Sequence, residues 1–128
     1  GLNRMFVYTA SKPDAKAFAQ AMKSGHSYVS FGPIIYPQNV MFGDTLKLAE
    51  NQSQSIQFDL LSVNGLKSVQ LLGNDGVIAQ RTVTGESVSV AFEVPQKSGW
   101  VSLVVEDTKA NKAFSNPIWL KMVDETQF

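Results

Sequence analysis

The chain has 128 residues, 44% of them hydrophobic, so it is long enough to bury one core and too short for two comfortable domains. Its 11 basic and 11 acidic residues balance, and no apolar run approaches the roughly 20 residues that span a bilayer, so we expect neither nucleic acid nor a membrane as a partner. Because the chain has no cysteine, disulfides, thiol nucleophiles and cysteine-based metal sites are excluded, whereas the cellular compartment stays open.

The first residues predict a strand followed by a helix. Residues 4–8 are bulky and largely apolar, as in a short strand. A helix is expected at about residues 12–24, with Ser11 as its N-cap and Gly25 to end it. One face of this helix is apolar, through Ala15, Phe18, Ala19 and Met22. Because one short helix cannot cover that face and the strand, we expect the helix to pack on the rest of the chain, or a homo-oligomer to form through these elements.

Beyond Pro33 apolar and polar residues alternate, which is typical of half-buried antiparallel strands. The alternation is clearest at Ile56, Phe58 and Leu60, at Val88, Val90, Phe92 and Val94, and at Val101, Leu103 and Val105. Between two further apolar runs, Asn74-Asp75-Gly76 predicts a hairpin. We therefore expect a mainly β protein, with an immunoglobulin-like antiparallel β-sandwich of about seven strands over residues 37–128. Residues 1–36 are expected to form a separate unit that contains the strand and the helix.

Few residues in the chain suit catalysis or metal binding. His26 is the only histidine, and after a helix end it suits a capping or surface role better than contact with a substrate. Asp59, Asp75 and the pair Glu106-Asp107 have no spacing that forces two carboxylates into one site, and they suit turns and strand edges. No Gly-x-Ser-x-Gly motif surrounds any serine. We therefore assign no catalytic residue, metal ligand or cofactor to this chain.

The aromatic residues allow two interpretations, because buried rings fill a core and exposed rings can stack on sugars. Trp100 and Trp119 adjoin alternating apolar residues, so we expect them in the core or at its edge. A second aromatic group flanks the Gly32-Pro33 turn and consists of Tyr28, Phe31, Tyr36 and Phe42. We expect this group to pack against an adjoining domain first and to line a ligand site second. The candidate binding residues at this junction are His26, Tyr28, Phe31, Gly32, Pro33 and Tyr36.

The order of these motifs resembles the C-terminal end of the CehA/McbA-type metallohydrolases of the PHP (polymerase and histidinol phosphatase) superfamily. After the strand and the helix, the matching segments are Gly25-His26-Ser27-Tyr28-Val29-Ser30-Phe31-Gly32-Pro33-Ile34-Ile35, Gly43-Asp44, Gly99-Trp100 and Ser115-Asn116-Pro117-Ile118-Trp119. The resemblance implies a β/α barrel that binds divalent metals and ends in the strand and helix of residues 1–36. His26 stands where the family pattern has arginine. The family's His-x-His and Asp-x-His metal motifs have no counterpart here, so no catalytic residue is carried over.

Two functions follow as expectations. The resemblance implies a C-terminal accessory sandwich of a metal-dependent phosphoesterase-like hydrolase, non-catalytic in isolation, whose partner is the N-terminal barrel of the same polypeptide. The alternative is a stand-alone β-sandwich that binds a carbohydrate or a protein through exposed aromatic residues. Exposure of Trp100, Trp119 or Tyr36 on one face would favour the second function, whereas their burial, or a position facing the Gly32-Pro33 junction, would favour the first.

Overall fold

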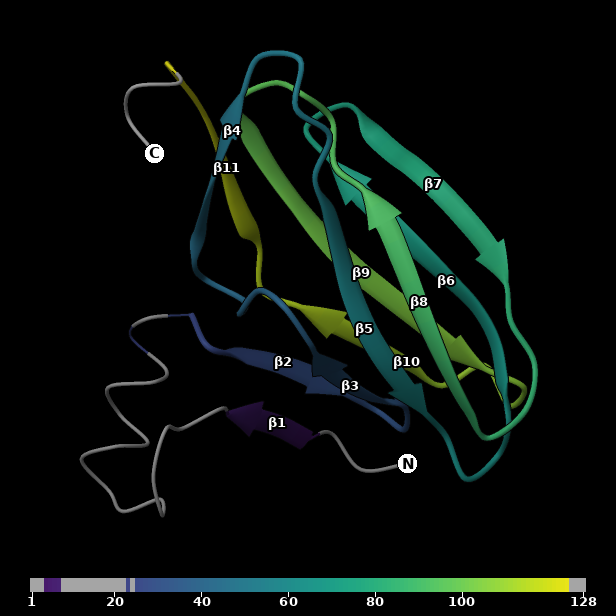
Figure 1. Cartoon of the computed structure of the whole chain (residues 1–128). Coiled ribbons are helices and arrows are strands. Elements are labelled where there is room, and N and C mark those ends of the chain that lie inside the picture. Colours follow the sequence, from purple (N-terminus) through teal and green to yellow (C-terminus); the bar gives the residue numbers. More distant parts are fainter. Residues whose placement is uncertain (1–3, 8–22, 24, 125–128) are drawn as a thin grey trace.

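The structure, a computed structural model, describes residues 4–7, 23 and 25–124, and this part of the chain forms eleven strands in two sheets (Figure 1). The larger sheet contains β1 (Arg4–Val7), β2 (Ser27–Ser30), β4 (Thr45–Ala49), β6 (Leu66–Gly73), β7 (Gly76–Thr82), β9 (Gly99–Asp107), β10 (Lys112–Ser115) and β11 (Ile118–Val123). The smaller sheet contains β3 (Ile34–Pro37), β5 (Ser55–Leu61) and β8 (Ser87–Glu93). The prediction of a mainly β protein is confirmed, and the two sheets are consistent with a β-sandwich.

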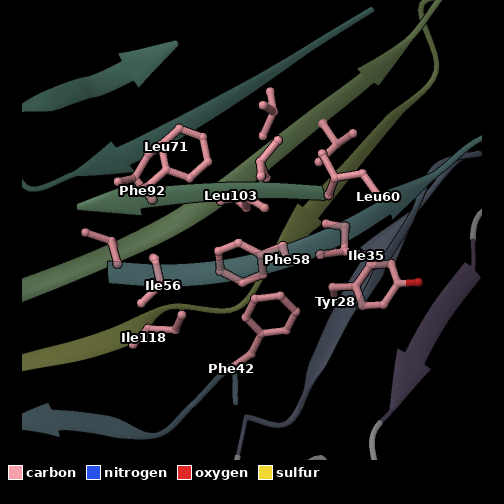
Figure 2. Close-up of a cluster of buried hydrophobic side chains, with 14 of the residues drawn as sticks. Tyr28, Ile35, Phe42, Ile56, Phe58, Leu60, Leu71, Phe92, Leu103 and Ile118 are labelled. Carbon is pink, nitrogen blue, oxygen red and sulfur yellow. The ribbon is translucent and has the colours of Figure 1, made fainter. Parts of the chain in front are cut away.

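The hydrophobic core lies between the sheets, because alternate side chains of each strand point toward the opposite sheet. Ile56, Phe58 and Leu60 of β5 are buried, whereas the residues between them are more exposed, as the alternation predicted. Figure 2 shows Phe58 beside Phe42, and their rings stack with centroids 5.8 Å apart. Tyr28 meets Phe42 edge to face at 6.3 Å. Each buried side chain of this size contributes about 1.5–3 kcal/mol to folding, so this aromatic group is a large part of the core.

The chain passes between the sheets twice near its N-terminus. Phe31, Gly32 and Pro33 carry it from β2 in the larger sheet to β3 in the smaller sheet, and residues 38–44 return it to the larger sheet as β4. Tyr28 on β2 and Ile35 on β3 are both buried in the core. The domain boundary expected between residues 36 and 37 falls inside β3, which pairs with β5 in the smaller sheet.

One strand pair differs from the antiparallel arrangement that the sequence predicted. β9 pairs with β6 on one side, and on its other side with β10 near one end and β11 near the other. β11 then pairs with β4 in parallel, from Trp119 opposite Thr45 to Val123 opposite Ala49. The prediction of a purely antiparallel sandwich is therefore wrong at this edge. Alternation of apolar residues indicates which face is buried and carries no information on strand direction, so it could not distinguish the two cases.

The predicted hairpin is present, with β6 and β7 paired around a turn at Asn74 and Asp75. Gly76, the first residue of β7, has a φ of 108°, a conformation that side chains disfavour, so the turn needs glycine there. The predicted N-terminal strand is present as β1, which pairs with β2. The predicted helix lies outside the described residues except for Lys23, and no helix in the described part of the chain is long and apolar enough to cross a membrane.

Candidate functional site

The six candidate binding residues do not form one surface. Tyr28 and Pro33 are buried, so neither presents its side chain to a ligand. Phe31 and Tyr36 are exposed, but Phe31 follows β2 of the larger sheet and Tyr36 lies on β3 of the smaller sheet. His26 precedes β2, at the opposite end of that strand from Phe31. The candidate residues therefore divide between the start of β2, near His26, and the crossing from β2 to β3, near Phe31 and Tyr36.

A cluster of five residues surrounds the start of β2, and we name it the junction cluster: Gly25, His26, Ser27, Asp44 and Asn116. The side-chain amide of Asn116 donates to the Oγ of Ser27 at 2.6 Å and to the carbonyl of Gly25 at 3.3 Å. The backbone N–H of Asn116 donates to the Ser27 carbonyl at 3.2 Å. Nε2 of His26 lies 3.2 Å from Oδ1 of Asp44, and both side chains are partly exposed. The cluster therefore joins three segments that are far apart in the sequence.

The backbone approaches closely at the same place. Gly25 has a φ of 76°, and a Cβ there would lie 3.1 Å from the Cα of Gly43. The N–H of Gly43 donates to the Pro117 carbonyl at 2.8 Å, and the N–H of Trp119 donates to the Asp44 carbonyl at 2.9 Å. Glycine at position 25, after the predicted helix, is thus favoured both by its backbone conformation and by its close contact with Gly43.

The second location is the crossing from β2 to β3, and hydrogen bonds within the turn and to β10 stabilise it. The hydroxyl of Ser30 donates to the carbonyl of Pro33 and accepts from the N–H of Gly32 at 2.9 Å. The N–H of Phe31 donates to the carbonyl of Lys112 at 2.8 Å. These hydrogen bonds connect the two ends of the turn to each other and the turn to β10, so the Gly32-Pro33 segment has a structural role. The side chain of Phe31, next to it, is exposed.

A fully buried carboxylate, Asp107, packs against this crossing. Its Oδ1 accepts the N–H groups of Lys109 and Asn111 at 2.9 Å, and its Oδ2 accepts the side-chain amides of Asn64 and Asn111 at 3.1 Å. Burial by itself raises the pKa of Asp107, but the hydrogen bonds from Asn64, Asn111 and Lys109 outweigh it and hold that pKa below its ordinary value. A Cβ on Gly32 would lie 3.0 Å from Oδ2 of Asp107, so only glycine fits against this group without a shift.

Trp119 is not in the core, contrary to the prediction. Ile118 and Leu120 are buried, and because neighbouring residues of a strand face opposite sides, Trp119 points outward and is 47% exposed. Its antiparallel partner is Trp100, so the two indole rings lie on the same outer face of the larger sheet. Trp100 is half-buried on this outer face, on the opposite side of β9 from the core residue Val101. The large apolar side chain of Trp119 suggested that it is buried, whereas its position between two buried residues of β11 makes it point outward.

Further apolar residues lie on the same outer face. Phe114 of β10 is 43% exposed and lies opposite Val29 of β2 and Val104 of β9. Val104 and Trp100 share the side of β9 that faces away from the core. We name these five residues, Val29, Trp100, Val104, Phe114 and Trp119, the apolar outer face. It extends along the strands that border the junction cluster.

The chemistry available in this region is recognition and positioning. Within residues 4–7, 23 and 25–124, no three histidine, aspartate or glutamate side chains come together as they would around a metal ion. The carboxylate oxygens of Asp107 are occupied by backbone and amide donors. The sequence interpretation missed the roles of Asn116 and Asp107, although the Asn116-Pro117 pair that interrupts β10 and β11 was a visible signal for a specialised turn.

The comparisons with known proteins leave the family open. No protein-family model matches the sequence, and no curated protein matches it significantly.

Proposed function

We propose that this chain is an immunoglobulin-like β-sandwich that accompanies the barrel of a PHP-type metal-dependent hydrolase and is itself non-catalytic. The observation that carries the proposal is the junction cluster. Three of the segments on which the family resemblance rests, around Gly25, Asp44 and Asn116, are distant in sequence and are joined by direct hydrogen bonds and an ion pair. Because these short motifs meet in space, a shared structural role explains their occurrence in one chain better than coincidence does.

The strand order supports the immunoglobulin-like type. With β3 as the first strand, the smaller sheet has the order β3-β5-β8, which corresponds to strands A, B and E. The other sheet places β9 between β6 and the interrupted β10 and β11, which corresponds to C, F and G, and β7 extends it as C′.

The apolar outer face gives such a barrel a surface to contact. Phe114 and Trp119 are exposed on one side of a sheet whose buried side already faces the core, and adjoining domains cover surfaces of this kind. The hydrogen bonds from Asn116 to Gly25 and Ser27 fix the position of the chain at the start of β2, so a preceding barrel would dock in one orientation. The divalent metals that the resemblance implies find no ligand group among the described residues, and we assign no step of hydrolysis to them.

Reading the coding sequence upstream of the Gly1 codon tests this proposal. We expect an open reading frame that encodes His-x-His and Asp-x-His motifs in the same polypeptide, and an unrelated preceding domain would refute the proposal. In the full polypeptide, acrylamide should quench Trp119 less than it does in this chain alone, because the barrel would cover the apolar outer face. Equal quenching would show that this face is not the contact.

A second function is favoured by one observation. Tyr36 is 46% exposed and Trp119 is 47% exposed, as expected if the sandwich binds a carbohydrate or a protein partner through aromatic side chains. The two residues lie on different sheets, so they represent two separate surfaces. A binding module of this kind is compatible with attachment to a hydrolase.

A further inference from the structure

The outer face of the smaller sheet carries a polar hollow that the junction does not use. β5 lies between β3 and β8 (Figure 1), and its Asp59 is opposite Tyr36 on one side and Ser89 on the other. These three side chains therefore form one row across the sheet. Beside the row is a hollow of about 310 Å³, lined by Gln38, Gln57, Phe58, Asp59, Ser89, Val90 and Ala91. The residues that line it belong to β5 and β8, apart from Gln38, which directly follows β3.

Two neighbours hold the carboxylate of Asp59 in place. The hydroxyl of Ser89 donates to Oδ1 at 2.6 Å, and the side-chain amide of Gln38 donates to Oδ2 at 2.6 Å. Each carboxylate oxygen has further acceptor capacity, and the amide of Gln38 has a second hydrogen to donate. The edge of the hollow is therefore a preorganised set of acceptors and donors.

Tyr36 lies beside the hollow, opposite Asp59, and Ala91 is part of its lining. Tyr36 is 46% exposed next to Asp59 and offers an aromatic ring at the end of the row. Ala91 is opposite Gln57 and has a short side chain, so the surface is low at that position. An exposed ring beside a polar depression can contact the apolar face of a flat molecule while side-chain amides bind the molecule's polar edge.

From this geometry we propose that the hollow beside Tyr36 binds a neutral sugar ring. A pyranose combines an apolar face of C–H groups with a rim of hydroxyls that both donate and accept hydrogen bonds, which matches Tyr36 on one side and Asp59, Gln38 and Gln57 on the other. No lysine or arginine lines the hollow, so it offers no charge to a phosphate or a carboxylate. The inference deepens the carbohydrate-binding alternative and is independent of the hydrolase proposal.

Calorimetric titration of the full chain with cellohexaose, xylohexaose, mannohexaose and maltohexaose tests the inference. We expect binding of at least one of these sugars, a loss of about tenfold or more in affinity for Tyr36→Ala, and a change of less than about threefold for Tyr36→Phe, which keeps the ring. Ala91→Gln should also abolish binding, because the longer side chain fills the hollow. Val63→Ala is the control, since it shortens a side chain that is 91% exposed and does not line the hollow, and it should bind like the parent chain. Trp119→Ala tests the apolar outer face as the alternative site.

Three results would overturn the inference. The first is that none of the four sugars binds the parent chain. The second is that affinity falls for Trp119→Ala and stays unchanged for Tyr36→Ala, which would move the site to the apolar outer face. The third is that Ala91→Gln binds normally while its circular dichroism spectrum matches that of the parent chain. None of these results bears on the hydrolase proposal, which depends on the upstream coding sequence and on shielding of Trp119.

Discussion

Replacing Asp107 with asparagine removes a buried negative charge and keeps the shape of the side chain. In the native chain five hydrogen bonds reach this carboxylate, from two backbone N–H groups at 2.9 Å, two side-chain amides at 3.1 Å and the hydroxyl of Ser62 at 3.4 Å. In Asp107→Asn the new amide can retain the four shorter bonds only if Asn64 and Asn111 turn their own amides to present oxygen, and its two hydrogens leave none for Ser62. The variant therefore exchanges five bonds to a charged acceptor for four neutral bonds at best.

The cost follows from that exchange. A hydrogen bond to a charged group contributes about 1 kcal/mol more than a neutral one, so the four shorter bonds give a loss of about 4 kcal/mol, to which the longer bond from Ser62 adds little. A neutral side chain is cheaper to bury, which returns about 1–2 kcal/mol. We therefore expect Asp107→Asn to lower the free energy of unfolding at pH 7 by about 2–3 kcal/mol. Asp75→Asn is the control, because the side chain of Asp75 is 86% exposed, and it should have little effect.

The pH dependence separates the charge from the shape. The pKa of Asp107 is lowered on folding, so its contribution to stability is complete above the unfolded value of about 3.9 and is lost as the pH falls through the folded pKa. Urea unfolding followed by tryptophan fluorescence should therefore show a smaller difference between the parent chain and Asp107→Asn at pH 3 than at pH 7. An equal difference at both pH values would refute the role of the charge, and a difference near zero at pH 7 would refute the role of the cluster.

Three other experiments test the fold and the junction. Gly32→Ala should lower the free energy of unfolding by about 1–3 kcal/mol, because its Cβ would lie 2.9 Å from the Cβ of Asn111. It should be more destabilising than Gly85→Ala, where only the φ of 89° opposes alanine. If urea unfolding shows the reverse order, the packing around Gly32 is not as described. Asn116→Ala should cost about 1–2 kcal/mol in the same assay through its two lost side-chain hydrogen bonds, and an unchanged midpoint would count against the junction cluster. In single-tryptophan variants, acrylamide should quench Trp119 more strongly than Trp100, and the opposite result would contradict the outward orientation of β11.

Local patterns were sufficient where one strand or one turn decides the structure. The alternation at Ile56, Phe58 and Leu60 predicted a strand with one buried face, and the structure has it. The turn at Asn74 and Asp75 was predicted because residues that tolerate positive φ stood between two apolar runs. Both features depend on neighbours in sequence, so their signals lie within a few residues.

Features that join distant segments could not be predicted in the same way. No local pattern connects Asn116 with Gly25 or the loop of Asp107 with Gly32, and these contacts exist only after the sheets have formed. The orientation of Trp119 is a different case, because its two buried neighbours already implied that it points outward. There the size of the side chain was given more weight than its position in the strand.

The hydrogen bond between Asn116 and Gly25 also sets an order of events during synthesis. These residues are 91 positions apart, so a nascent chain in which Asn116 has not yet been added lacks the donor that binds the Gly25 carbonyl. Closing so large a loop costs more chain entropy than closing the short loop between β9 and β10, so we expect this bond to form after those two strands have paired. A unit made earlier on the ribosome would thus complete its own folding before the sandwich could fix its position.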